Sequence, residues 1–141
     1  MGRNCCVYSS FIFLLNAIVA YYYNYFIYSY LFVLLFGSSI IYHLNYNIYT
    51  YIIDKTSVIS VVSYGGYLFF YKIFERKTEL NNIVITYSSL VVLTFLSIIY
   101  LYYYGYCYNK YCFNEDINSS QIYHSLLHVF ASIGHFFITI L

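Results

Sequence analysis

Long apolar runs alternate with short polar segments along the whole chain. A helix that crosses the hydrocarbon core of a membrane needs about 20 mostly apolar residues. Runs of this length predict five transmembrane helices, at residues 7–23, 25–45, 49–72, 83–104 and 120–141. Asn24 divides the first two, because the apolar stretch that ends at Tyr42 is too long for one crossing. The pattern therefore predicts an all-α integral membrane bundle that forms a single domain over residues 1–141.

The polar segments predict the connections and the orientation. The strongly charged stretch from Lys72 to Asn82 is predicted to be a loop. Each predicted face carries three basic residues, so their number does not decide the orientation. The clustering of Lys72, Arg76 and Lys77 in one short loop favours that face as the cytoplasmic one. Tyrosines gather at the predicted span ends, notably at residues 21–23 and 102–104, where their rings would anchor the helices at the headgroup level.

The composition supports the membrane assignment and limits the partners. The chain has 62% hydrophobic and 8% charged residues, whereas a soluble domain has roughly 25% charged residues. A net charge of +1 without a basic run argues against a nucleic-acid partner. Twenty-three tyrosines with no tryptophan and no proline are typical of an AT-rich genome, such as that of a large DNA virus or a protist. The predicted location is therefore an endomembrane or a host or viral membrane.

Three histidines and an aspartate are predicted to lie near one face of the membrane. His43 ends the second predicted helix, and Asp54 follows near the start of the third. Two further crossings return the chain to the same face, where His124 and His128 lie near the start of the last helix. Histidine and aspartate are costly in hydrocarbon, so this group is a candidate functional site.

The spacing of the histidines indicates a metal site. Residues four apart share a helix face, so His124 and His128 can direct two imidazoles at one ion, with His43 as the third ligand. Three protein ligands and an open position are the catalytic arrangement of Zn²⁺, which lowers the pKa of water to about 7. Asp54 would orient that water or take its proton, and Ser39, one turn before His43, could hydrogen-bond the water or a developing oxyanion.

Each of these residues also has a structural interpretation. His43 can be an interfacial histidine bonded to a backbone carbonyl, and Asp54 an exposed carboxylate at a helix start with Lys55 as its ion partner. Ser39 can be a small residue that packs helices together. His135 lies about 10 Å along the helix from His128 and is expected to be a buried hydrogen-bonding residue rather than a ligand.

Glycines and cysteines complete the sequence-based expectations. Glycines within the spans are expected to mark close contacts between helices; they are Gly65, Gly66 and Gly134. The cysteines are predicted to lie on the same membrane face as the candidate site; they are Cys5, Cys6, Cys107 and Cys112. They could form a disulfide from the N-terminus to the last loop, or remain unpaired thiols.

The motifs resemble those of a known group of membrane hydrolases. Ser39-x3-His43-x10-Asp54 followed by His124-x3-His128 is similar to the CREST superfamily, which includes the alkaline ceramidases, the PAQR receptors with the hemolysin III proteins, and related phospholipases. The resemblance implies a zinc ion held by the three histidines and hydrolysis of a lipid amide or ester, with ceramide or a phospholipid as substrate. It also implies seven helices, whereas five are predicted here, and a homo-oligomer could restore the missing wall.

Two other functions are compatible with the pattern. A non-enzymatic multi-pass protein, receptor-like or structural, would contain at most a structural metal that joins the second and last helices. An ion conduit along the last helix would need polar residues across the bilayer, but Phe136, Phe137 and Ile138 make that end apolar.

Overall fold

The computed structural model describes residues 3–74 and 81–141, and this part of the chain contains helices and no strand. The elements in chain order are α1 (Arg3–Ser10), α2 (Ile12–Tyr22), α3 (Phe26–Leu44), α4 (Ile48–Phe74), α5 (Asn82–Ile99), the π-helical turn η1 (Tyr100–Tyr104), α6 (Gly105–Tyr108), the 3-10 turn η2 (Tyr111–Phe113) and α7 (Ile117–Ile140). The prediction of an all-α bundle is confirmed.

Five helical segments are long and apolar enough to cross a membrane, which supports a multi-pass membrane protein. They are Cys5–Tyr22, Phe26–Leu44, Ile48–Phe74, Asn82–Phe113 and Ile117–Ile140. Large apolar side chains lie exposed on the outer faces of these helices, as expected where lipid replaces water. The tyrosines at residues 21–23 are among the exposed side chains, in agreement with their predicted place at a span end.

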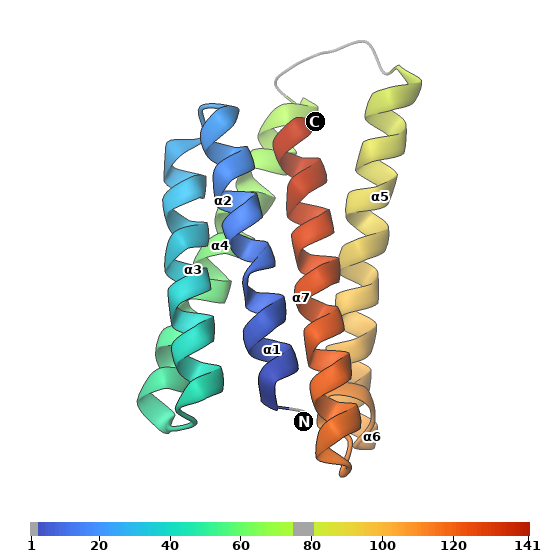
Figure 1. Ribbon diagram of the computed structural model, residues 1–141. Helices are drawn as coiled ribbons and strands as arrows, with labels where there is room; N and C mark the ends of the chain where they lie inside the picture. Colours follow the sequence, from blue (N-terminus) through green and yellow to red (C-terminus); the bar gives the residue numbers. More distant parts are fainter. Residues whose placement is uncertain (1–2, 75–80) are drawn as a thin grey trace.

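The helices run side by side, and their ends bring the candidate site residues to one end of the bundle. The last turn of α3, the first turns of α4 and α7, and the start of α1 all lie at the lower end in Figure 1. The C-terminal end of α7 lies at the opposite end (Figure 1). The end of α3 and the starts of α4 and α7 therefore lie on the same side of the bundle, as the number of crossings predicted.

The first span is interrupted at Phe11, which the hydropathy pattern did not indicate. Phe11 separates α1 from α2, just after two serines whose hydroxyls both donate to the Cys6 carbonyl, from Ser9 at 3.1 Å and from Ser10 at 2.7 Å. Serine hydroxyls that bond to the carbonyl one turn earlier weaken the helix ladder and bend helices. Two adjacent hydroxyls that share one carbonyl are the local feature at this interruption, whereas the separate bonds of Thr56 and Ser60 leave α4 continuous.

Two asparagines in the left-handed conformation end helices. Asn24, with φ of 63°, ends the α2 segment and confirms the predicted break. Asn109, with φ of 51°, ends α6. The predicted helix end at Tyr104 is therefore wrong by four residues, since the helix continues through η1 and α6 to Tyr108. Gly105 permits this turn, because a Cβ there would lie 2.6 Å from the Lys110 carbonyl oxygen.

A buried polar pair lies at the centre of the bundle. The Tyr28 hydroxyl is hydrogen-bonded to Nδ1 of His135, and both side chains are fully buried. His135 is thus the buried hydrogen-bonding histidine that its position predicted. Gly65 packs against this pair, and Gly134 packs against Thr94, as predicted for close helix contacts. The same prediction is wrong for the neighbour of Gly65, because a Cβ on Gly66 would meet nothing within 4 Å.

Lys72 is not part of a polar loop. It lies in α4 with 4% of its side chain exposed, and its ammonium donates to the carbonyls of Ile138 at 2.8 Å and Thr139 at 2.7 Å. The last carbonyls of a helix lack partners within the helix, so Lys72 satisfies the C-terminal end of α7. The other two basic residues of the predicted loop, Arg76 and Lys77, lie outside the described residues.

Candidate metal centre

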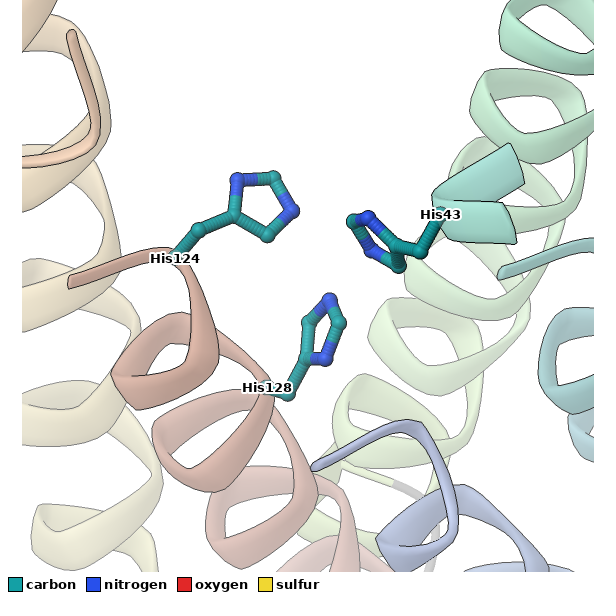
Figure 2. Close-up of side chains that lie close together, drawn as sticks. All are labelled: His43, His124 and His128. Atoms are coloured by element: carbon teal, nitrogen blue, oxygen red, sulfur yellow. The ribbon is translucent and has the colours of Figure 1, made fainter. Parts of the chain in front are cut away.

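Three imidazoles converge at the end of the bundle where α3 ends and α7 begins. One ring nitrogen from each of His43, His124 and His128 lies within 4.8 Å of the others. The ring centres are 5.2 Å apart for His43 and His124, 5.4 Å for His43 and His128, and 5.1 Å for His124 and His128. Figure 2 shows the three rings pointing toward a shared space between the two helices. The structure brings together the three residues that the sequence predicted as ligands.

Local helix structure positions these side chains. His43 lies in the last turn of α3. His124 and His128 are one turn apart on α7, whose start is fixed by Asp116, because its carboxylate accepts from the backbone N–H groups of Asn118 and Ser119. The hydroxyl of Ser119 donates to the same carboxylate, and these bonds hold the pKa of Asp116 below its usual value.

The donor set fits a metal ion. Two nitrogens bound tetrahedrally to one zinc at about 2.0–2.1 Å lie about 3.3 Å apart. The histidine nitrogens lie within 4.8 Å of one another, so small side-chain rotations would bring them to the spacing that zinc requires. Among the described residues, none forms a hydrogen bond to the rings of His43 or His124, so their nitrogens remain available. His128 uses Nδ1 in a hydrogen bond with Ser9 and keeps Nε2 available. The three histidines can therefore hold a metal ion.

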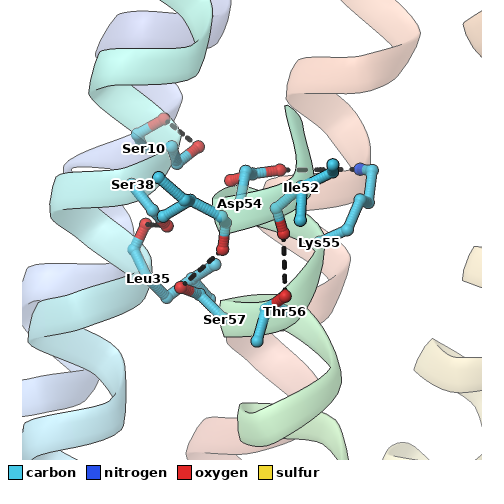
Figure 3. Close-up of polar contacts among 10 residues, drawn as sticks. Ser10, Leu35, Ser38, Ile52, Asp54, Lys55, Thr56 and Ser57 are labelled. Carbon is cyan, nitrogen blue, oxygen red and sulfur yellow. Dashed lines mark hydrogen bonds and ion pairs between the residues drawn. The ribbon is translucent and has the colours of Figure 1, made fainter. Parts of the chain in front are cut away.

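Asp54 is buried near this end of the bundle but does not belong to the three-histidine group. Its side chain is 6% exposed, and Oδ2 lies 3.5 Å from the Lys55 ammonium (Figure 3). Oδ1 is buried and has no hydrogen-bond partner among the described residues. The ion pair of the structural interpretation is present, but the expected exposure at a helix start is wrong, because Asp54 is buried and lies inside α4, which begins at Ile48.

Lys55 connects α4 to the neighbouring helices. Its ammonium lies 5.9 Å from the ring centre of Tyr42, 5.5 Å from that of Tyr51 and 6.0 Å from that of Tyr102. At these distances the ring faces attract a cation. Lys55 therefore links α4 to the end of α3 and to η1 through these rings.

Ser39 is fully buried and is held by the first helix. The residue is 1% exposed, and its hydroxyl lies 2.9 Å from the Ser10 hydroxyl. Ser9, the neighbour of Ser10, contacts His128 with its Oγ 2.8 Å from Nδ1. Sequence reasoning missed Ser9 and Ser10, although two adjacent serines in an apolar span are a signal that polar partners lie nearby.

A cavity of about 450 Å³ reaches two of the three histidines. Its lining residues come from α1, the end of α3, η2 and the start of α7; they are Cys6, His43, Leu44, Tyr46, Cys112, Asn114, Ile117, Ser120, Gln121 and His124. The side-chain carbonyl oxygen of Gln121 is buried and has no hydrogen-bond partner in the described part of the chain. The cavity therefore offers a polar path to two of the candidate ligands, His43 and His124.

All four cysteines are free thiols, which agrees with the unpaired alternative. Cys6 and Cys112 are buried and line the cavity, whereas Cys5 and Cys107 are exposed.

Comparisons of the chain with protein-family models, with curated proteins and with solved structures found no match.

Proposed function

We propose that this chain is a zinc-dependent hydrolase of membrane lipids that cleaves an amide in the manner of a ceramidase, with His43, His124 and His128 as the zinc ligands. The main support is the group of three ring nitrogens at one end of a membrane bundle. Imidazole is a preferred zinc ligand, and three protein ligands leave a position open for substrate. The described residues contribute no fourth His, Cys, Asp or Glu to this group, which favours an open site.

The chain's own residues supply the remaining functions of a hydrolase. Zinc bound here would supply Lewis acidity and make water a nucleophile near neutral pH. Asp54 accepts a proton through Oδ1, its oxygen without a partner. The cavity admits water and the polar end of a lipid to His43 and His124. No Lys, Arg, Asp or Glu is among its described lining residues, which favours an uncharged headgroup such as that of ceramide over a phospholipid.

The first test is the zinc content of protein purified in a mild detergent. We expect about one zinc per chain in the wild type and almost none after the double change His124→Ala and His128→Ala. His135→Asn is the matched control, because it removes the remaining histidine of the chain but not a ligand. Circular dichroism confirms that each variant remains helical. An equal zinc content in the wild type and the double variant would refute the metal site.

The second test is hydrolysis of ceramide and of phospholipids in mixed micelles. We expect zinc-dependent release of fatty acid from ceramide, reduced about 10²–10⁴-fold by Asp54→Asn, the usual effect of losing a general base. Glu115→Gln is the control, because it makes the equivalent change at an exposed carboxylate that takes no part in the cap of α7. Zinc binding without hydrolysis of either lipid would reject the enzymatic proposal.

A structural metal is the second candidate. Within the described residues, the backbones of α3 and α7 do not approach each other closely, and the two helices meet at the centre of the bundle through Tyr28 and His135. An ion bound by His43 and by the two α7 histidines would add a second link between them at this end. A structural zinc has four closed protein ligands, and the thiols of Cys6 and Cys112, which line the same cavity, are candidates for the fourth. X-ray absorption separates the two candidates: a sulfur ligand at about 2.3 Å favours the structural ion, and only nitrogen and oxygen ligands favour the hydrolase.

A further inference from the structure

Two consecutive serines of α1 connect the first helix to the candidate metal centre. Ser9 lies with its Oγ 2.8 Å from Nδ1 of His128 on α7. Ser10 lies with its Oγ 2.9 Å from the hydroxyl of Ser39 on α3. Both serines also bond to the Cys6 carbonyl, at 3.1 Å from Ser9 and 2.7 Å from Ser10. A single turn of α1 therefore contacts one proposed ligand and one proposed catalytic residue.

The hydrogen bonds of Ser9 determine which nitrogen of His128 carries the proton. A hydroxyl has one proton to donate, and a carbonyl oxygen can only accept. Ser9 therefore donates to Cys6 and accepts from His128, which requires that Nδ1 carry the hydrogen. A neutral imidazole has one N–H, so the lone pair of His128 is on Nε2. The ring of Phe13, with its centre 5.0 Å from that of His128, packs against the imidazole and helps to fix its orientation.

The same count of donated protons applies to Ser39. Ser10 donates its proton to the Cys6 carbonyl, so in the bond between the two hydroxyls Ser39 is the donor. The Ser39 oxygen can then accept a further hydrogen bond but has no proton left to donate. Two roles were expected for Ser39. It can still accept a hydrogen bond from water, but it cannot stabilise an oxyanion, because that would require a hydrogen-bond donor.

We infer that Ser9 is a positioning residue that holds His128 in its Nδ1–H tautomer and directs Nε2 to the metal, an inference that rests on the metal site of the proposed function. Partners of this kind orient metal-binding histidines, and their loss typically lowers metal affinity 10–100-fold. Ser10 makes the equivalent contact to Ser39 and does not contact His128, so it provides a matched control one residue away.

The test compares wild type with Ser9→Ala, Ser9→Thr and Ser10→Ala in detergent. The ¹⁵N spectrum of histidine-labelled, metal-free protein reports the tautomer of each ring. We expect His128 to be the Nδ1–H tautomer in the wild type, in Ser9→Thr and in Ser10→Ala, and to lose this preference in Ser9→Ala. Competition with a chelator should show zinc binding weakened 10–100-fold in Ser9→Ala, restored in Ser9→Thr and retained in Ser10→Ala.

The outcomes separate this inference from the proposed function. An Nε2–H tautomer at His128 in the metal-free wild type would overturn the role of Ser9, even if Ser9→Ala failed to fold. Equal zinc affinity in Ser9→Ala and wild type would also overturn it. If the wild type binds no zinc but its Nδ1–H tautomer is lost in Ser9→Ala, the proposed function fails and the positioning of His128 by Ser9 is supported.

Discussion

Replacing Gly65 with alanine would place a methyl group between α4 and the buried pair of Tyr28 and His135. A Cβ on Gly65 would lie 2.5 Å from the Tyr28 hydroxyl and 2.8 Å from both Cε1 and Nδ1 of His135. These separations are well below normal carbon contacts, and both neighbouring side chains are fully buried with little room to move. The added methyl therefore must push α4 outward or break the hydrogen bond between Tyr28 and His135.

The size of the effect follows from three contributions. Overpacking of a dense core costs about 1–3 kcal/mol. Weakening a buried hydrogen bond costs about 0.5–1.5 kcal/mol, and the higher helix propensity of alanine returns about 0.5–1 kcal/mol. We expect Gly65→Ala to lower the free energy of unfolding by about 1–3 kcal/mol. The neighbouring Gly66→Ala is the matched control, because its Cβ would meet nothing within 4 Å and only the propensity gain remains.

The assay is reversible unfolding in mixed detergent micelles, followed by circular dichroism at increasing dodecyl sulfate. The measured quantity is the difference in the free energy of unfolding between Gly65→Ala and Gly66→Ala. Adding Tyr28→Phe to Gly65→Ala removes the hydroxyl contact at 2.5 Å but leaves both His135 contacts at 2.8 Å, so rescue should be partial. Equal stability of the two alanine variants would refute the close packing of α4 against this pair.

Two further predictions concern the ends of α7. Lys72→Met should lower the free energy of unfolding by about 1.5–3 kcal/mol, because it removes a charged donor from two buried carbonyls. The same change at the exposed Lys110 should leave the free energy of unfolding unchanged. Equal effects of the two variants in a denaturation assay would contradict this prediction. Asp116 has a pKa below its ordinary value of 3.8, so its stabilising contribution is present above that value and is lost as the pH falls through the lowered pKa. Asp116→Asn should therefore reduce the loss of thermal stability in acid, and an unchanged pH profile would count against the cap.

The positions of the spans could be predicted because they depend on local properties of the chain. Apolar run length sets the number of crossings, and Asn24 tolerates the left-handed backbone that ends α2. The break at Phe11 could not be predicted in this way, because the apolar run continues through it. The burial of Lys72 also needed the fold, because the carbonyls that it satisfies lie 66 and 67 residues away.

The three histidines could be predicted to meet because membrane crossings restrict each residue to one side. His43 ends one span and His124 and His128 begin another, so parity alone brought them to the same end of the bundle. The contact of Ser9 with His128 spans 119 residues, so the two adjacent serines indicate that a polar partner is near but not which residue it is. The two adjacent glycines show the same limit, since only the rotation of α4 determines that Gly65 and not Gly66 faces a neighbour.

The first helix explains how a five-span chain can hold this site together. Within the described residues, α3 and α7 carry the candidate ligands and touch each other through Tyr28 and His135 at the centre of the bundle, while α1 packs against both helices. Polar groups in an apolar interior must find partners, and the hydroxyls of Ser9 and Ser10 provide them for His128 and Ser39. His43 and His124 receive no such partner from the described part of the chain, and both line the cavity. Their nitrogens are thus the polar groups that a bound cation would satisfy, so we expect metal binding to stabilise this end of the bundle.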